Sequence, residues 1–185
     1  SRDGTIKIWD LESGALLYSL GDHTWSINGI QLTEDDSRLI SYSRDGTIKI
    51  WDLESGALLH SLVSHYERAD GVQLTKDDSR LISYAIDSYI NMWDIESGSL
   101  IYGGSYHLDE IWGVQLTKDE SRGISYCNRA EINIWDVESG ELLHSLEDHT
   151  SFIAGIQLTK DDSRLISYSL DGTIKIWDVE SGALI

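Results

Sequence analysis

The chain of 185 residues has no proline, one cysteine, one phenylalanine and one methionine. Because Cys127 is the only cysteine, no disulfide can form within the chain. No apolar run approaches the roughly 18 residues that would indicate a membrane-spanning helix, so no membrane span is predicted. No signal peptide is visible in the sequence, and we expect a cytoplasmic protein.

Basic residues are also scarce. The chain has 14 Lys and Arg against 32 Asp and Glu, which gives a formal net charge of −18 and a pI near 4.4. Phosphate backbones and anionic lipids would be repelled by this charge, so neither a nucleic-acid nor a membrane partner is expected. The charge favours a protein or peptide partner, in particular a basic one.

What the sequence does contain is a repeat with a constant step of 42 residues. Each copy carries a Trp-Asp dipeptide, beginning at Trp9, Trp51, Trp93, Trp135 and Trp177. Four histidines and four serines keep the same step. A fixed period near 40 residues is typical of architectures in which each unit stacks on its neighbours. The sequence therefore predicts one repeat domain over 1–185, with units 1–42, 43–84, 85–126 and 127–168 and a partial unit 169–185.

Each unit is predicted to hold four short strands and no helix. In the first unit these are 6–9, 16–20, 27–33 and 38–42, separated by turns rich in Asp and Gly. Apolar residues alternate with polar ones, as Ile48 and Ile50 do, and the Asp45-Gly46 pair is a tight-turn signal. These features indicate an all-β chain.

The Trp-Asp dipeptides and the preceding histidines resemble the WD40 β-propeller family over the whole chain. The resemblance implies blades of four antiparallel strands, called a to d from the inner strand outward. Complete blades are then expected at about 24–62, 66–104, 108–146 and 150–185, and residues 1–20 form an extra c–d hairpin. We expect two chains to close one ring of eight blades. The alternative is that the chain is a window of a longer array.

Histidine, serine, aspartate and tryptophan recur together. This pattern is compatible with either a hydrolase triad or a structural hydrogen-bond network. A catalytic set occurs once in a protein, whereas this one is repeated in each blade, which favours structure over catalysis. In WD40 proteins the matching residues form a buried hydrogen-bonded tetrad. The predicted tetrad residues are His23, Ser41, Asp45, Trp51, His65, Ser83, Asp87, Trp93, His107, Ser125, Trp135, His149, Ser167, Asp171 and Trp177.

The set of His107, Ser125 and Trp135 lacks its aspartate, because Arg129 stands at that position. We interpret this unit as an eroded blade, since it also replaces leucines with Gly104 and Gly123. The alternative is that the turn 128–130 has been given over to binding. Residues 108–146 are predicted to open first.

No metal site, cofactor or phosphate-binding loop is expected. The close histidine pairs are His60 with His65 and His144 with His149, and a structural zinc site would normally add cysteines. Acidic residues gather at the a–b and c–d turns, which predicts an acidic rim at one end of the blades. We expect this rim to be solvated; weak cation binding is the alternative.

Comparison of the units with one another shows where the sequence changes. The variable positions fall in the d–a loop with the start of strand a, and in the b–c turn, which the resemblance places at the end opposite the acidic rim. Loops on a rigid scaffold commonly carry recognition, and large aromatic residues and arginine are typical interface anchors. The predicted partner-binding residues are Trp25, Ser26, Asn28, Arg44, Tyr66, Glu67, Arg68, Asp70, Ile86, Asp109, Glu110, Trp112, Asn128, Phe152 and Leu170.

The sequence thus predicts a non-catalytic protein-interaction scaffold. The alternative is an engineered or amplified repeat array whose only property is self-assembly into a closed propeller. In either case we expect a homodimer that completes the propeller.

Overall fold

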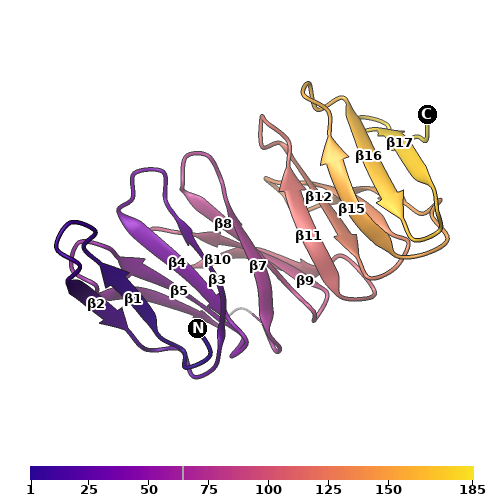
Figure 1. Cartoon of the computed structure of the whole chain (residues 1–185). Helices are drawn as coiled ribbons and strands as arrows, with labels where there is room; N and C mark the ends of the chain where they lie inside the picture. The colour runs from indigo at the N-terminus through magenta and orange to yellow at the C-terminus, as the bar shows by residue number, and fades with distance from the viewer. Residues whose placement is uncertain (64) are drawn as a thin grey trace. The chain divides into compact units, whose positions relative to one another are not determined.

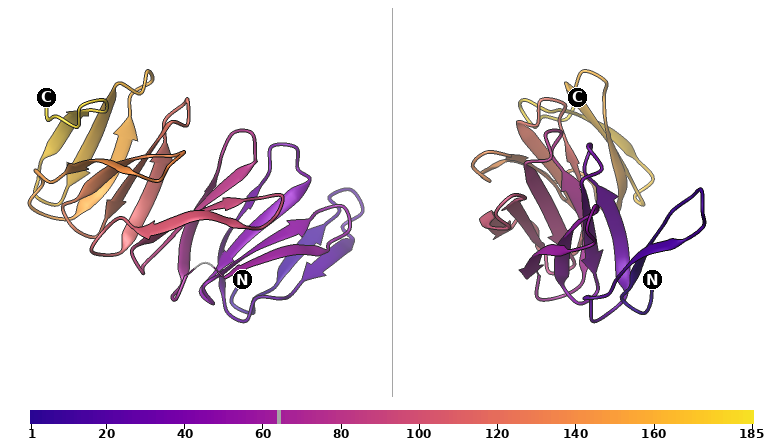
Figure 2. Two further views of the ribbon diagram at one scale, coloured as in Figure 1. Left: turned by 180° about the vertical axis from the view of Figure 1, so that it is seen from behind. Right: turned by 90° about the vertical axis from the view of Figure 1, so that its left-hand side faces the viewer.

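A computed structural model describes residues 1–63 and 65–185, and all regular structure in this part of the chain is β (Figure 1). Two further views show the same strands and turns from other sides (Figure 2). The described residues include no helix of the length and apolarity that crossing a membrane requires. The chain divides into two compact units, Ser1–Ala85 with Asn91–Ile101 and Ile86–Ile90 with Tyr102–Ile185, and each is described by itself.

The first unit begins with a two-stranded hairpin, β1 (Ile6–Trp9) and β2 (Leu16–Leu20). A four-stranded sheet follows, with its strands in sequence order: β3 (Ile27–Leu32), β4 (Arg38–Ser43), β5 (Thr47–Asp52) and β6 (Leu58–Val63). Each neighbouring pair of these strands is antiparallel, so this sheet has the meander order of the predicted blade.

A second four-stranded sheet has the order β10-β9-β8-β7. Its strands are β7 (Ala69–Leu74), β8 (Arg80–Ala85), β9 (Tyr89–Asp94) and β10 (Leu100–Ser105). In the first unit, Ile48 and Ile50 of β5 share one buried cluster with Ala69, Leu81 and Trp93. Neighbouring sheets therefore pack face to face.

The second unit holds a four-stranded sheet of β11 (Ile111–Leu116), β12 (Arg122–Cys127), β13 (Ile132–Asp136) and β14 (Leu142–Leu146). Beside it lie β15 (Ile153–Leu158), β16 (Arg164–Ser169) and β17 (Ile174–Asp178). Ile132 and Ile134 pack with Leu158, Leu165 and Trp177 in one buried cluster. This cluster has the same arrangement as the one in the first unit.

The last sheet differs in detail from the expected fourth complete blade. It has three strands, and its outer strand is reduced to a bridge between Trp177 and Leu184. Leu184 stands one repeat step after Leu142 and pairs as Leu142 does with Trp135.

The tyrosine that recurs on strand b lies over a glycine of strand a. Tyr42 packs against the buried cluster of the first unit and covers Gly29, its cross-strand partner. A Cβ atom on Gly29 would lie 2.1 Å from the Tyr42 hydroxyl oxygen. A glycine on strand a is therefore required for the tyrosine to lie flat over it.

Candidate partner-binding surface

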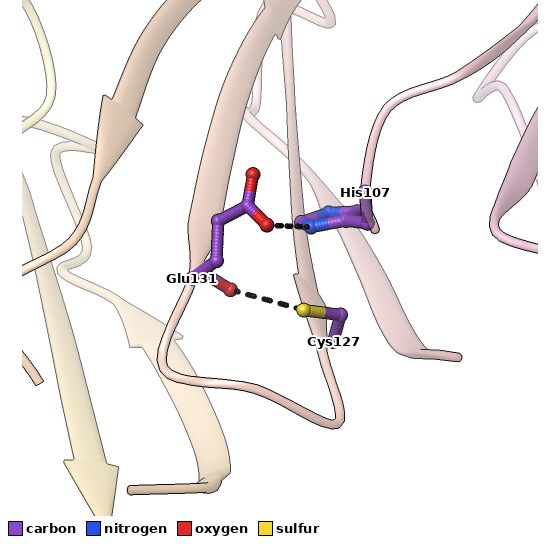
Figure 3. Close-up of side chains that lie close together, drawn as sticks. All are labelled: His107, Cys127 and Glu131. Carbon is purple, nitrogen blue, oxygen red and sulfur yellow. Dashed lines mark hydrogen bonds and ion pairs between the residues drawn. The ribbon is translucent and has the colours of Figure 1, made fainter. Parts of the chain in front are cut away.

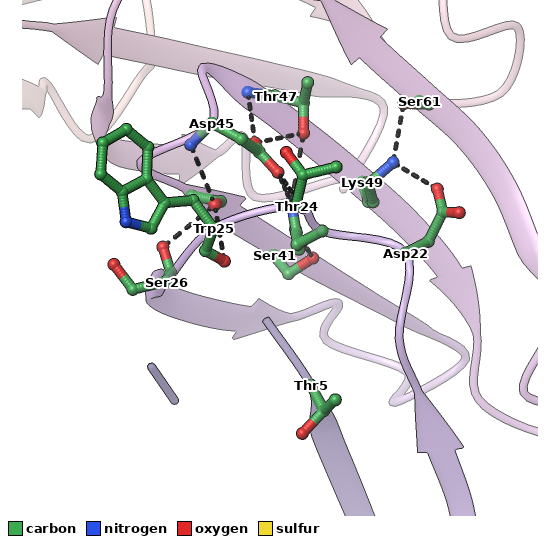
Figure 4. A network of polar contacts seen from close by, with 12 residues as sticks. Thr5, Asp22, Thr24, Trp25, Ser26, Ser41, Asp45, Thr47, Lys49 and Ser61 are labelled. Atoms are coloured by element: carbon green, nitrogen blue, oxygen red, sulfur yellow. Dashed lines mark hydrogen bonds and ion pairs between the residues drawn. The ribbon is translucent and has the colours of Figure 1, made fainter. Parts of the chain in front are cut away.

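The framework beneath the variable loops is a chain of hydrogen bonds from the d–a loop to strand c. In the first complete blade His23 Nε2 lies 2.8 Å from Ser41 Oγ, and Trp51 Nε1 donates to the same oxygen at 2.9 Å. His23 Nδ1 lies 3.0 Å from Asp45 Oδ2. Figure 4 shows Ser41 and Asp45 in this network. Since His23, Ser41 and Trp51 are buried, the network fixes the loop to the sheet away from water.

The charges of this network follow from its contacts. Burial alone raises the pKa of Asp45, but hydrogen bonds from Thr47, the Thr24 N–H and His23 outweigh burial and hold that pKa at about 2. Burial lowers the pKa of His23, against the opposing effect of Asp45. The stable state of the pair is therefore a carboxylate beside a neutral imidazole.

The same arrangement recurs in the last blade. His149 lies 2.8 Å from both Ser167 Oγ and Asp171 Oδ2, and Trp177 donates to Ser167 Oγ at 2.8 Å. Hydrogen bonds, first from Thr173, lower the pKa of Asp171.

In the second set, Ser83 Oγ lies 3.0 Å from both His65 Nε2 and Trp93 Nε1. Asp87 belongs to the second unit, where its Oδ1 accepts the Tyr89 N–H at 3.1 Å.

The third set is built differently, in a way that sequence comparison missed. His107 Nε2 keeps its contact with Ser125 Oγ at 2.7 Å, but the carboxylate near its Nδ1 comes from Glu131, at 3.6 Å. Glu131 stands two residues after Arg129, at the position of Thr47 in the first blade. Arg129 instead pairs with Asp109 of the d–a loop, Nε to Oδ2, at 2.9 Å. The sequence did contain a signal: a glutamate follows two residues after the position where the aspartate is missing.

Trp135 also departs from the pattern. Its Nε1 has no hydrogen-bond partner among the described residues. The indole occupies the space above Gly123, where a Cβ atom would meet the ring at 2.2 Å. Leucine fills this position in the other three units, so Gly123 allows the ring to shift. Trp135 is fully buried there and lies beside Tyr106, with ring centroids 5.8 Å apart.

A second missed feature is a lysine on strand c that anchors the residue before the histidine. Lys49 Nζ donates to Asp22 at 2.5 Å and to Ser61 Oγ at 3.0 Å, although the lysine is only 5% exposed. Lys175 pairs with Asp148 in the same way. The signal was present in the sequence, because aspartate precedes the histidine of the two complete blades, 24–62 and 150–185, whose strand c carries this lysine.

The serine of each set is unsuited to nucleophilic catalysis. Ser41, Ser83 and Ser167 are 0% exposed, and each oxygen already receives an indole N–H. A nucleophile must reach a substrate carbonyl beside an oxyanion hole. These hydroxyls face the interior of a sheet, so the arrangement serves to hold loops.

The variable position on strand a is the extra residue of a β-bulge. Ile27 pairs with Ser43 and Gly29 pairs with Tyr42, which leaves Asn28 unpaired. The same shift falls at Asp70, Trp112 and Ala154. A bulge re-aims its side chain, so these positions can change without loss of sheet pairing.

The second variable segment, the b–c turn, is tied to the d–a loop of the same blade. The N–H of Arg44 donates to Ser26 O at 3.0 Å, that of Asn128 to Glu110 O at 2.8 Å, and that of Leu170 to Phe152 O at 2.9 Å. In three blades the structure thus brings the two variable segments together into one rim.

In the first unit the rim contains a hollow of about 620 Å³. Four of the predicted residues line it, Trp25, Ser26, Asn28 and Arg44, together with Ser1 and Arg2. The Trp25 ring is largely exposed, whereas Asn28 donates to Ala69 O at 2.8 Å and is held in place.

Further along this unit the rim is more polar. Tyr66 and Glu67 are exposed, and Arg68 Nε lies 2.9 Å from Asp70 Oδ1.

In the second unit the predicted rim residues cluster around two aromatic rings. Trp112 and Phe152 lie with their centroids 6.3 Å apart, and each is 45% exposed. Leu170 is also exposed, while Glu110 and Asn128 are half-buried. Ile86 is half-buried and lies apart from this pair, in the segment Ile86–Ile90.

The a–b and c–d turns carry the expected acidic residues, but arginine lies among them. In the first unit a hollow of about 290 Å³ is lined by acidic residues of both turn types around Arg38. The Arg38 guanidinium donates to Ile95 O at 3.3 Å and pairs with Glu96. In the second unit Arg122 makes the equivalent contacts with Val179 and Glu180. Arginine therefore joins neighbouring sheets at this end.

Comparison with known proteins agrees with this geometry. The family model described as "WD domain, G-beta repeat" matches residues 14–52 and 140–178. Each segment ends in a copy in which the Asp-Gly turn and the Trp-Asp dipeptide are both intact, as they also are at residues 3–10. Eukaryotic translation initiation factor 3 subunit I of Culex quinquefasciatus is 45% identical over 42 residues, which is 23% of this chain and 13% of that protein. The match therefore covers a small part of that relative. The chain therefore carries WD40 repeats at these two segments, and its other units share their 42-residue period and their four-stranded sheets.

Proposed function

We propose that the chain is a non-catalytic scaffold that binds a protein or peptide through the rim of d–a loops and b–c turns. The observation that carries the proposal is the combination of bulged, variable positions with exposed aromatic rings. Trp25 is 60% exposed, and Trp112 and Phe152 form a half-exposed pair. Exposed rings on a rigid framework are typical interface anchors.

The chemistry of the partner follows from this surface. Aromatic rings favour an apolar or aromatic anchor side chain, and the net charge of −18 favours basic residues around it. The same charge opposes nucleic acids and anionic membranes. A cytoplasmic location accompanies this proposal as a prediction.

The test is a selection of peptides from a random displayed library on the wild-type chain. The triple variant Trp25→Ala, Trp112→Ala, Phe152→Ala is expected to lose at least about thirtyfold in affinity for the selected peptides, because anchor residues typically contribute 2 kcal/mol or more. Its thermal unfolding should match that of the wild type.

The control removes three apolar side chains that are similarly exposed on the outer strands, Leu59, Leu100 and Leu143, each replaced by alanine. This variant should bind the peptides as the wild type does. Equal binding by the rim variant, or a loss confined to the control, would contradict the proposed rim.

A specific observation favours self-assembly as a second property. Ile174 and Ile176 of β17 are 71% and 38% exposed, whereas their equivalents Ile48 and Ile50 are fully buried under the next sheet. Ile30 and Leu32 of β3 are exposed as well. We infer that a second copy of the chain covers these two apolar faces. On the β3 side it would pack beside the β1–β2 hairpin, whose Ile6 and Ile8 already contact the cluster of Leu39 and Trp51.

Charge placed on the exposed face should separate the copies. Ile174→Glu is expected to give a single-chain mass in light scattering, because a carboxylate would be buried without a partner. Val63→Glu is the control, since Val63 is 81% exposed on the outer strand β6. A dimer that survives Ile174→Glu would exclude this face as the interface.

A further inference from the structure

Three potential metal ligands converge beside the third tetrad. His107 comes from the d–a loop, Cys127 from the end of β12, and Glu131 from the residue before β13. One donor atom of each residue lies within 4.8 Å of the other two. Figure 3 shows the Glu131 carboxylate facing the His107 ring, with the Cys127 sulfur beside the Glu131 backbone.

This combination belongs to one repeat. The position of Cys127 holds Ser43 in the first set and Ser169 in the last. The position of Glu131 holds Thr47 in the first set and Thr173 in the last. The second set has alanine and tyrosine at these positions. The carboxylate has moved two residues along the chain and the serine has become a thiol, so both changes place ligands around the same imidazole nitrogen.

The histidine is oriented for coordination. Its Nε2 is held by Ser125 Oγ at 2.7 Å, so Nδ1 is the nitrogen that faces Glu131 and Cys127. Ligating histidines usually have their second nitrogen fixed by a hydrogen bond in this way. The His107 side chain is fully buried, whereas that of Glu131 is 20% exposed and gives an ion access from solvent.

A fourth residue at the cluster has unused hydrogen-bonding capacity. The Asn133 amide lies 2.8 Å from Glu131 Oε1 and 3.3 Å from His107 Nδ1 through its Nδ2. Its Oδ1 is buried and has no hydrogen-bond partner in the part of the chain that the structure describes. A buried unpaired oxygen is costly. Rotation of the amide, which would turn Oδ1 toward the cluster in place of Nδ2, would let an ion or its bound water satisfy this oxygen.

The geometry points to a binding site for one Zn²⁺-like divalent cation, held by His107 Nδ1, Cys127 Sγ and a Glu131 carboxylate oxygen. Tetrahedral zinc bonds of about 2.0–2.3 Å place neighbouring ligand atoms roughly 3.3–3.8 Å apart. The histidine and glutamate atoms are already 3.6 Å apart, and the sulfur must approach by about an ångström at most. Nitrogen and thiolate ligands select against Ca²⁺ and Mg²⁺. Sequence reasoning did not group these residues.

The test uses the metal-free full chain and Co²⁺ as a spectroscopic substitute for Zn²⁺. Co²⁺ is expected to produce thiolate-to-metal charge-transfer absorption at one equivalent, and Zn²⁺ should displace it. Since Cys127 is the only cysteine, this absorption reports on that sulfur alone. Zn²⁺ should also raise the unfolding temperature, because an ion bound to the folded state stabilises it.

The other repeats supply fold-compatible variants. Cys127→Ser and Glu131→Thr each install the residues that the first and last sets carry, so both variants should fold. Cys127→Ser should abolish the absorption, and Glu131→Thr should weaken binding by at least about the tenfold to hundredfold that loss of an outer-sphere partner costs. Ser169→Cys together with Asp171→Asn, added to Cys127→Ser, is the control, since it offers a thiol near His149 without a carboxylate beside that histidine.

Absence of charge-transfer absorption in the wild type would overturn the site. So would equal absorption from the control that carries its thiol at position 169. Zinc binding that neither variant changes would show that the acidic surface, and not this cluster, holds the ion.

Discussion

At the residue scale, one hydroxyl joins the loop histidine to the strand tryptophan. Ser41 Oγ contacts both His23 Nε2 and Trp51 Nε1, so its loss leaves two buried polar groups unpaired. Ser125 Oγ contacts His107, while the Trp135 N–H lies elsewhere without a partner among the described residues. Equivalent serines therefore have different roles in stability.

This difference predicts that Ser41→Ala destabilises more than Ser125→Ala. Each unpaired buried group costs about 1–3 kcal/mol, so Ser41→Ala should lose roughly 2–6 kcal/mol and Ser125→Ala about half of that. Urea unfolding of both variants measures the difference. Equal losses would mean that the indole hydrogen bond contributes nothing.

Stability is also predicted to fall on acidification in two steps. Burial lowers the pKa of His23 below 6.5, so the unfolded chain binds the proton first and stability falls as the pH drops below 6.5. The pKa of Asp45 is held at about 2 instead of 3.8, so a second loss lies between about pH 4 and pH 2. Asp45, Lys49 and Asp22 are the charged groups that act on His23.

Unfolding free energies measured from pH 8 to pH 2 test this dependence. His23→Gln should reduce the step below pH 6.5, to which His107 also contributes. Asp45→Asn should reduce the step below pH 4, to which Asp35, Asp119 and Asp161 also contribute. A variant that keeps the slope of its own step would contradict the assignment.

At the scale of the strand and the blade, Gly123 allows the altered packing of the third tetrad. We expect Gly123→Ala to destabilise by about 1–3 kcal/mol, because the new methyl group would overlap the Trp135 ring. Gly104→Ala on β10 is the control, since its Cβ atom would make only ordinary contact with Tyr106. A stabilising Gly123→Ala would mean that the space above Gly123 is loosely packed, as in an eroded blade, and that the Trp135 ring does not need the glycine.

The order of opening among the blades stays a prediction. Residues 108–146 have a longer histidine–carboxylate distance and an unpaired indole N–H, whereas the buried Trp135 opposes opening. Amide hydrogen exchange should show the lowest protection in this blade. If its strands were the best protected, the prediction would be wrong.

Much of each blade could be predicted from sequence, because strands and turns are set by local patterns. Alternation at Ile48 and Ile50 and the Asp45-Gly46 pair located β5 and the turn before it to within a residue. The bulge at Asn28, the shift of Trp135 toward Gly123 and the use of Glu131 depend on contacts between strands. A repeat alignment marks these positions as variable but does not show where their side chains lie.

At the scale of the whole molecule, two exposed apolar faces bear on the proposed self-assembly. Ile174 and Ile176 of β17 are exposed, as are Ile30 and Leu32 of β3, although their equivalents are buried or half-buried. Apolar side chains exposed along a strand are typical of interaction or aggregation sites. Closure by a second copy would bury both faces and remove the open edges.

The molar mass in solution, measured by light scattering over a range of concentrations, tests this closure most directly. One chain has a mass of 20.8 kDa. The account predicts a discrete species of twice that mass, which falls to the single-chain value in Ile174→Glu. A wild-type mass of one chain at every concentration would contradict it.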